Sequence, residues 1–364
     1  MIRQGHVGAT EATVLVAVAV AAKAFLSGPA VMAAWAGTAA ALALLLNGLL
    51  AIGLVSLVIH SLDPQREEGL VEQFERTGGL FGTLLMAAVA FSFLSVTGLG
   101  LRELSGQIAS GILVRTPVTV TSGAAVLVFS YGAYLGLESI ARAAMVFAVP
   151  TVAGTFSLFL LALPRLDPSH LTPVFGYGWR SFLTTSLFAG WYREAWLAPI
   201  LFVYLRDRKR GLSMAVQGVG IGAAVVVLIV GGLLAMFDFP NITRLSFAVL
   251  EGARGIYAGE FVSNLESVFV FLFTTGVFLQ LTITFWASCL LVADLLHLPE
   301  YRPLVPLLGT GVWLLAFLPP SLMSAVHWMY YDLRRMASFF LYPGILLMWV
   351  LAILRRRGAR RNAV

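Results

Sequence analysis

The sequence predicts an all-α integral membrane protein with ten transmembrane helices, and two observations carry this prediction. Apolar residues make up 59% of the 364 positions and charged residues only 12%, whereas about a quarter of a typical globular protein is charged. The apolar residues also gather in runs that approach or exceed the ~20 residues needed to cross the hydrocarbon core as a helix. A β-barrel is disfavoured, because its strands would be about 10 residues long with alternating polarity.

Ten apolar segments follow one another along the chain. They cover roughly residues 12–35, 37–61, 79–112, 117–135, 139–163, 181–205, 211–237, 263–294, 303–320 and 336–354. The third and eighth segments are too long for an upright crossing, so we expect them to be tilted. Lys and Arg are densest at residues 206–210 and 355–361. The positive-inside rule then places both termini in the cytoplasm of a multi-pass cell-membrane protein.

The remaining composition argues against several classes of function. The net charge of +6 is explained by topology and anionic lipid heads, so no nucleic-acid partner is expected. Scattered histidines, the single Cys289 and the lack of a nucleophile motif predict no enzyme, no metal site and no cofactor. Gly218, Gly220 and Gly222 follow no strand, so they predict close helix packing instead of dinucleotide binding.

Charged residues near the middle of two apolar segments are the strongest functional signal. Lys23 is the only charged side chain between Glu11 and Asp63. A lysine at mid-bilayer depth costs about 2.5–3.5 kcal/mol on insertion scales, so it needs a partner or a task. Arg193 and Glu194 interrupt the sixth segment at nearly the same depth. Interruptions at matching places in two halves predict a midplane binding site in an inverted-repeat fold.

Short motifs in order along the chain resemble the B subunit of spore germinant receptors. They are Lys23-Ala24-Phe25-Leu26-Ser27-Gly28-Pro29, Arg102-Glu103-Leu104-Ser105, Arg115-Thr116-Pro117, Leu171-Thr172-Pro173-Val174-Phe175-Gly176, Tyr301-Arg302-Pro303, Leu318-Pro319-Pro320 and Leu354-Arg355-Arg356-Arg357. That family belongs to the amino-acid, polyamine and organocation transporter superfamily. The resemblance implies a single domain of five plus five helices with discontinuous helices 1 and 6, a first repeat at about 11–164 and a second at about 180–355. It also implies partner subunits of the A and C types and the inner membrane of the spore.

One departure from the family concerns the first break. The family usually has a glycine-rich stretch there, whereas this chain has Ala21-Ala22-Lys23-Ala24, which should unwind less readily.

The candidate ligand site combines the two breaks, because a broken helix frees N–H groups for an anion and C=O groups for a cation. The expected ligand is an amino acid. Its expected contacts are Ala22, Lys23, Ala24, Phe25, Leu26 and Ser27 at the first break, and Ala189, Gly190, Trp191, Tyr192, Arg193 and Glu194 at the second. Lys23 and Glu194 form a coupling or charge pair. Equally, the three charges alone could be a structural cluster that holds the broken helices in register.

Weaker candidates lie outside the two breaks. Arg102 and Glu103 form a candidate outer gate near the end of the third segment, with local ion pairing as the alternative. Thr275 and Gly276 could face the ligand from the eighth segment, although such threonines more often bond to their own backbone. Residues 243–260 predict an amphipathic helix outside the membrane, either a lid or a docking surface.

Three functions compete at this stage. The first is a sensor that binds a small germinant, an amino acid, and signals to partner subunits. The second is a secondary transporter that couples amino-acid uptake to protons or sodium. The third is a structural membrane subunit without a ligand site.

Overall fold

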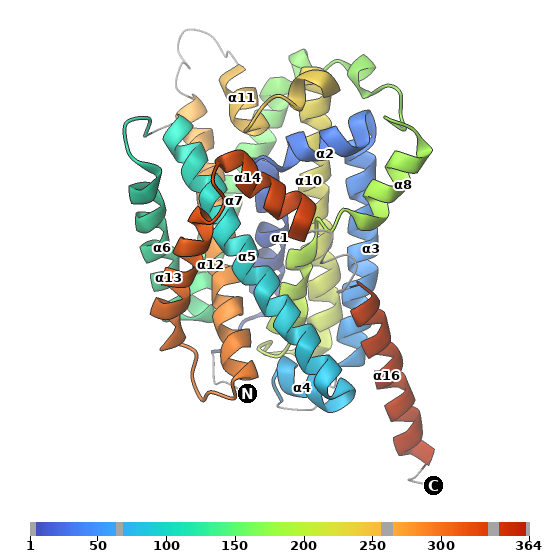
Figure 1. Ribbon diagram of the computed structural model, residues 1–364. Helices are drawn as coiled ribbons and strands as arrows, with labels where there is room; N and C mark the ends of the chain where they lie inside the picture. Colours follow the sequence, from blue (N-terminus) through green and yellow to red (C-terminus); the bar gives the residue numbers. More distant parts are fainter. Residues whose placement is uncertain (1–4, 63–67, 112, 256–264, 334–341, 362–364) are drawn as a thin grey trace.

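The computed structural model describes residues 5–62, 68–111, 113–255, 265–333 and 342–361. All regular elements in these ranges are helical, and they stand together as one bundle (Figure 1). The all-α prediction is therefore confirmed.

The helices follow the predicted order. They are α1 (Ala9–Ala21), α2 (Gly28–Ala36), α3 (Ala40–Ser61), α4 (Leu70–Gly78), α5 (Leu80–Gly111), α6 (Val118–Leu135), α7 (Leu137–Ala162), α8 (Trp179–Phe188), α9 (Leu197–Phe202), α10 (Gly211–Ile242), α11 (Ala248–Gly255), α12 (Leu265–Leu295), α13 (Leu304–Phe317), α14 (Leu322–His327) and α16 (Tyr342–Arg361). Short turns that matter for the site are the 3-10 turns η1 (Ala22–Phe25) and η5 (Arg193–Trp196) and the π-helical turn η8 (Trp328–Asp332).

Six helical stretches among the described residues are long and apolar enough to cross a membrane. They are Gly28–Ser61, Leu80–Gly111, Val118–Leu135, Leu137–Arg165, Arg208–Ile242 and Val270–Leu295. The pair formed by α13 and α14–η8, bent by 112°, adds a seventh if it is one span. Each of the ten predicted segments contains helix within the described ranges. The first and sixth segments are interrupted, as predicted, and their pieces are therefore short.

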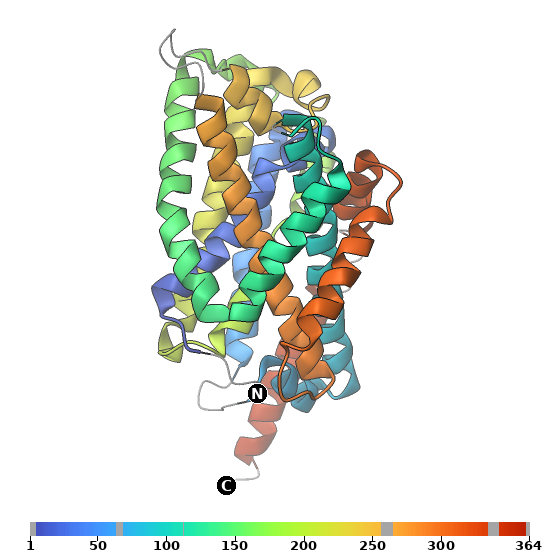
Figure 2. The same ribbon diagram turned by 90° about the vertical axis from the view of Figure 1, so that its left-hand side faces the viewer.

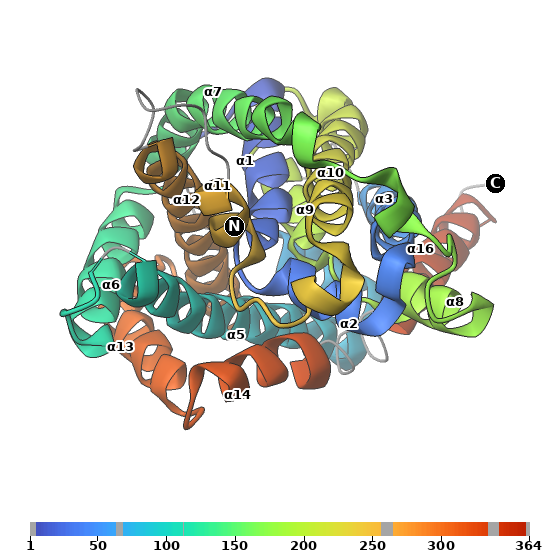
Figure 3. The ribbon, with the colours of Figure 1, turned by 90° about the horizontal axis from the view of Figure 1, so that it is seen from above.

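Helix α1 lies inside the bundle, surrounded by α7, α10 and α12 (Figure 3). Its closest neighbour is α10, where Gly218 and Gly222 let the backbones approach. A Cβ at Gly218 would lie 2.8 Å from Val16 Cβ, and one at Gly222 would lie 2.7 Å from Val20 Cβ. Small residues permit such contact between membrane helices, whose association depends on packing. The packing role predicted for this glycine series is confirmed for these two residues.

The α1–α10 contact gives a direct stability test. Gly218→Ala is expected to destabilise the protein by about 1–3 kcal/mol, because the new methyl group overpacks a closed interface. Gly220→Ala is the matched control, since the nearest atom to its Cβ would be Ile52 Cδ1 at 3.9 Å. Thermal unfolding in detergent measures both. Equal melting temperatures for the two variants would contradict the close α1–α10 contact.

The long segments are oblique, as expected from their length. Helix α5 crosses the bundle diagonally (Figure 1), and α12 runs aslant from one end to the other (Figure 2). Two elements were not predicted. Residues 321–333 were expected to be a connection but form α14 and the π-turn, and the short helix α4 precedes α5. These stretches are short and only moderately apolar, so a hydropathy pattern of about 20 residues does not reveal them.

The predicted amphipathic helix at 243–260 is present in part as α11. Val249 and Ala253 are buried on its inner face, and Arg254 pairs with Glu251 at 3.0 Å on the outside. Residues 256–260 of the prediction lie outside the described residues.

Both ends of the described chain lie at the same end of the bundle (Figure 1). The N–H of Val7 donates to the carbonyl of Tyr204 at 3.1 Å, which places the start of the chain beside the basic residues 206–210. The end of α16 lies at the same end of the bundle (Figure 1). The cytoplasmic placement of this end stays a prediction.

Candidate functional site

The first helix breaks within residues 22–27. Helix α1 ends at Ala21, the 3-10 turn η1 follows, and Leu26 is extended with φ −100° and ψ −152° before α2 starts at Gly28. Pro29 suits the first turn of a helix because its missing N–H has no partner there in any case. The helix is therefore interrupted despite the alanines at 21, 22 and 24, and the next helix starts at Gly28-Pro29.

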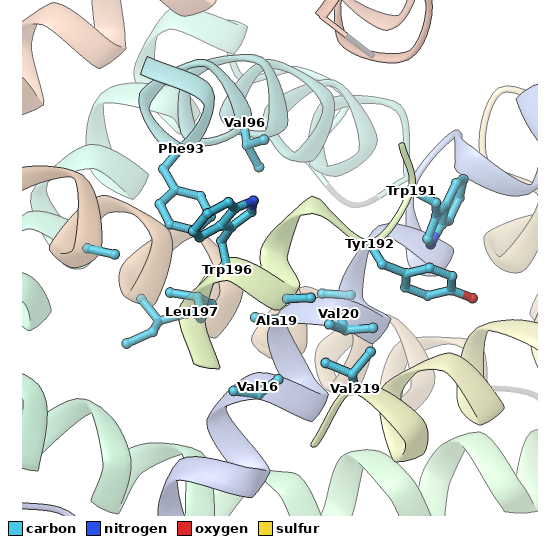
Figure 4. Packing of buried hydrophobic residues seen from close by; sticks show 14 of the residues in the cluster. Val16, Ala19, Val20, Phe93, Val96, Trp191, Tyr192, Trp196, Leu197 and Val219 are labelled. Carbon is cyan, nitrogen blue, oxygen red and sulfur yellow. The ribbon is translucent and has the colours of Figure 1, made fainter. Parts of the chain in front are cut away.

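The sixth helix breaks between Phe188, the last residue of α8, and η5. Gly190 has a φ of +54°, a conformation that glycine adopts at little cost. Trp191 and Tyr192 then point to one side of the break, whereas Trp196 points to the other, toward α5 (Figure 4). Side chains on the two sides of the break thus point in different directions. The two adjacent charged residues between them, Arg193 and Glu194, are buried inside the bundle.

An ion pair joins the two breaks. The Nζ of Lys23 lies 2.5 Å from Oε2 of Glu194 and also donates to the carbonyl of Trp191. The Trp191 ring centroid lies 5.4 Å from the same Nζ, a cation–π contact. Lys23 is 1% exposed and Glu194 0% exposed. The predicted charge pair is thus formed, and both groups are removed from the surface.

A second carboxylate, Glu103 of α5, enters the first break. Its Oε2 accepts from Ser27 Oγ at 2.5 Å and from the Ser27 N–H at 3.3 Å. Glu103 is fully buried. The oblique course of α5 carries it to this depth, so it lies at the break and not at an outer rim. Its neighbour Arg102 turns away, with its guanidinium 5.0 Å from the Phe317 ring centroid.

Arg193 completes the cluster and connects it to another helix. Its Nε lies 3.9 Å from Glu194 Oε1, and its Nη2 donates to the carbonyl of Met329 in the π-turn at 3.3 Å. Gln280 of α12 donates from Nε2 to the same Oε1 at 3.5 Å. We call Lys23, Glu103, Arg193 and Glu194 the charge cluster. Its four formal charges cancel, which limits the cost of burying them.

Two amides satisfy carbonyls that the breaks leave free. Nδ2 of Asn47 donates to Ser186 O at the end of α8 at 2.8 Å, and Nε2 of Gln107 donates to Phe25 O at 3.0 Å. Backbone groups without a partner are costly away from water, so these amides stabilise the broken conformation. Sequence reasoning missed both. Asn47 is a lone amide in an apolar run, and that anomaly could have revealed it.

A pocket of about 490 Å³ adjoins the first break. It opens beside Ser27 and is lined by α2, by residues 243–247 before α11, and by α14 with the π-turn. We call this pocket the vestibule. His327 and Tyr331 from its wall stack with ring centroids 4.7 Å apart. Ser27 therefore connects the two features, because its hydroxyl donates to Glu103 and the same residue lines the vestibule.

The other predicted residues have mixed positions. Ala22, Ala24 and Leu26 are buried packing residues of the break. Phe25 stacks on Phe273 of α12 at 4.5 Å between centroids, close to Gly276. Thr275 donates its hydroxyl to Phe271 O of its own helix at 2.8 Å, the structural alternative expected for it. Ala189 and Gly190 shape the second break. Ligand contact by any of these residues stays a prediction.

Two spore germination proteins are similar to this chain in sequence. The chain is 24% identical to the spore germination protein KB of Bacillus subtilis (strain 168) over 222 residues, 59% of this chain and 59% of that protein. It is 24% identical to the putative spore germination protein YfkT of the same strain over 188 residues, 50% of each chain. The two alignments thus span 59% and 50% of the relatives' own lengths.

A solved structure shows the same fold. The crystal structure of MhsT in complex with L-phenylalanine superposes with a TM-score of 0.71 at 14% identity, covering 97% of this chain and 89% of that one. The transporter fold expected from the two interrupted helices is confirmed. A model of the family described as spore germination protein matches residues 6–321, nearly the whole described bundle. The chain therefore belongs to the spore germination protein family.

Proposed function

We propose that this protein is the integral membrane subunit of a germinant receptor, which binds a small germinant, an amino acid, at its two helix breaks and signals to A-type and C-type subunits. The observation that supports this proposal most is the neutral charge cluster, which joins both breaks next to an open vestibule. The family supports the role in germination. Binding would change the conformation only as far as the ligand prefers one state over the other.

The chemistry of the breaks suits an amino acid. Its carboxylate needs hydrogen-bond donors, which the N–H and hydroxyl of Ser27 supply at the start of α2. Its ammonium needs acceptors, which the carbonyl of Trp191 and the carboxylate of Glu194 supply. Both sets lie in unwound backbone at the junction of two helices, where secondary transporters hold their substrates.

Binding by the purified full-length protein in nanodiscs tests this function. A screen of the common amino acids should identify ligands that raise the melting temperature, because binding to the folded state alone stabilises it. Glu194→Gln is expected to weaken binding by about tenfold or more, since a charged acceptor contributes ~1.5–3 kcal/mol. Lys23→Ala should also change the affinity. Unchanged affinity in both variants, shown to fold, would remove the ligand site and leave the structural subunit as the function.

A matched control separates the cluster from general loss of charge. Glu138 forms a surface pair with Arg142 at 3.5 Å, and its side chain is 44% exposed. Glu138→Gln should leave amino-acid affinity unchanged, because exposed pairs contribute little.

The fold similarity to MhsT favours a second candidate, a transporter that couples amino-acid movement to protons or sodium. Counterflow of labelled amino acid into proteoliposomes distinguishes the two. A sensor binds without net exchange across the membrane, whereas a transporter exchanges.

A further inference from the structure

We propose that Lys23 and Glu103 occupy the ligand site as an internal zwitterion, and that an amino acid binds by exchanging ion-pair partners with them. This inference rests on the proposed function, because it describes how that same site receives its ligand. It assigns Glu103 to the ligand site, where Glu103 competes with the ligand carboxylate for the hydrogen-bond donors of Ser27. The sequence had predicted an outer gate for this residue.

The ammonium of Lys23 holds the acceptors that a ligand ammonium requires. Its Nζ contacts the Trp191 carbonyl and lies 2.5 Å from Glu194 Oε2, and it faces the Trp191 ring at 5.4 Å. A carbonyl, a carboxylate and an aromatic face are the usual surroundings of a bound amine. This half of the site is therefore filled by a side chain of the protein.

The carboxylate of Glu103 holds the donors that a ligand carboxylate requires. Its Oε2 accepts from both the N–H and the hydroxyl of Ser27 at the residue before α2. The other oxygen, Oε1, is buried and has no hydrogen-bond partner among the described residues. Glu103 is thus hydrogen-bonded to Ser27 through one of its two carboxylate oxygens only. A ligand carboxylate can therefore replace it at Ser27.

Exchange leaves no charge without a partner. Before binding, Lys23 pairs with Glu194 and Glu103 with Ser27. After binding, the ligand ammonium pairs with Glu194, the ligand carboxylate with Ser27, and the displaced Lys23 with the displaced Glu103, which enters the same helix break as Lys23 through its bond to Ser27. An amino acid carries no net charge, so the neutral charge cluster stays neutral. Removing one partner of a buried pair without replacement is strongly unfavourable, and exchange avoids that state.

The route of entry follows from the position of Ser27. Because Ser27 lines the vestibule, an incoming carboxylate meets the Ser27–Glu103 contact first. Lys23 and Glu103 are both buried, but Glu103 is the one that is hydrogen-bonded to Ser27, whereas Lys23 is paired with Glu194. Release of Glu103 therefore precedes release of Lys23, and Glu103 becomes the partner that receives it.

Exchange also determines which ligands bind. The neutral wild-type cluster should accept zwitterions and reject amino-acid amides and N-acetyl amino acids, because each of these leaves a net charge in the bilayer interior. Changing the charge of the cluster should change the preferred charge of the ligand in the opposite sense.

The experiment uses the full-length protein in nanodiscs and three probes each of alanine, leucine and phenylalanine: the free amino acid, its amide and its N-acetyl derivative. The decisive variant is Lys23→Ala/Glu103→Ala, which removes both internal occupants and keeps the cluster neutral. Free amino acids are expected to bind it about tenfold more tightly than wild type by calorimetry, corresponding to about 1.4 kcal/mol. A purely structural cluster predicts weaker binding instead.

Single variants test the charge rule. Lys23→Ala makes the cluster negative by one and should shift preference to the amide. Glu103→Ala makes it positive by one and should shift preference to the N-acetyl amino acid. Lys209→Ala and Glu138→Gln are the matched surface controls, because Lys209 is exposed and the side chain of Glu138 is 44% exposed. Both controls should retain the wild-type preference.

Each outcome decides. If wild type binds a free amino acid but the double variant binds it no more tightly, or the single variants keep the wild-type preference, the internal zwitterion is wrong and the proposed function stands. If wild type and double variant bind none of the probes or the other common amino acids, the proposed function fails as well. If the double variant does not fold, judged by gel filtration, the folded single variants decide: a shift to the amide or to the N-acetyl derivative supports the exchange, and an unchanged preference overturns it.

Discussion

Replacing Lys23 with alanine is expected to destabilise the protein by about 3–5 kcal/mol, because Glu194 is then left buried without its ammonium partner. The pair is completely enclosed, with 1% and 0% of the two side chains exposed. Water cannot take over the role of the lysine at that depth. Thermal unfolding of the purified protein in one detergent measures the effect.

The second substitution Glu194→Gln should restore most of this loss when it is combined with Lys23→Ala, because the uncompensated carboxylate is removed together with the lysine. Lys209→Ala on the exposed basic segment is the control and should leave the melting temperature unchanged. A Lys23→Ala protein that melts at the wild-type temperature would show that Glu194 does not depend on this lysine.

Gly28→Leu is expected to have the second large effect, a loss of about 3 kcal/mol or more, because the site has no room for a side chain. A Cβ alone would lie 2.3 Å from Trp191 Cη2 and 2.9 Å from the carbonyl oxygen of Lys23. The substitution therefore pushes the two breaks apart at the point where they touch. Both the melting temperature and amino-acid binding should fall.

Gly53→Leu provides the matched control for Gly28→Leu. Gly53 lies on the exposed side of α3, and a Cβ there would meet no atom within 4 Å. Its melting temperature should stay close to wild type. If Gly28→Leu is equally well tolerated, the contact between Gly28 and Trp191 does not join the breaks.

The sequence was sufficient for the fold class and the two breaks, because a buried charge is a strong local signal. Lys23 and Glu194 were recognisable from their isolation within apolar segments, and the structure brings them together. The order of the long helices followed from hydropathy alone. The division into repeats at 11–164 and 180–355 stays a prediction.

Other parts could not be read from the sequence for physical reasons. The depth of Glu103 depends on the oblique course of α5, which a one-dimensional hydropathy profile does not contain. The π-turn after α14 has no sequence signature. Asn47 and Gln107 act on backbone carbonyls that are free only once the breaks exist, so their partners depend on the fold itself.

The π-turn has a mechanical consequence. Its Met329 carbonyl receives the guanidinium of Arg193, while the same turn presents Tyr331 to the pocket beside Ser27. A π-helical turn holds one residue more than an α-helical turn, and it can revert by a local change of register. Rearrangement at Glu194 would pull on Arg193 and so bias that register. The π-turn thereby connects Arg193 in the interior of the bundle to the Tyr331 wall of the vestibule, so that a change at one would alter the other.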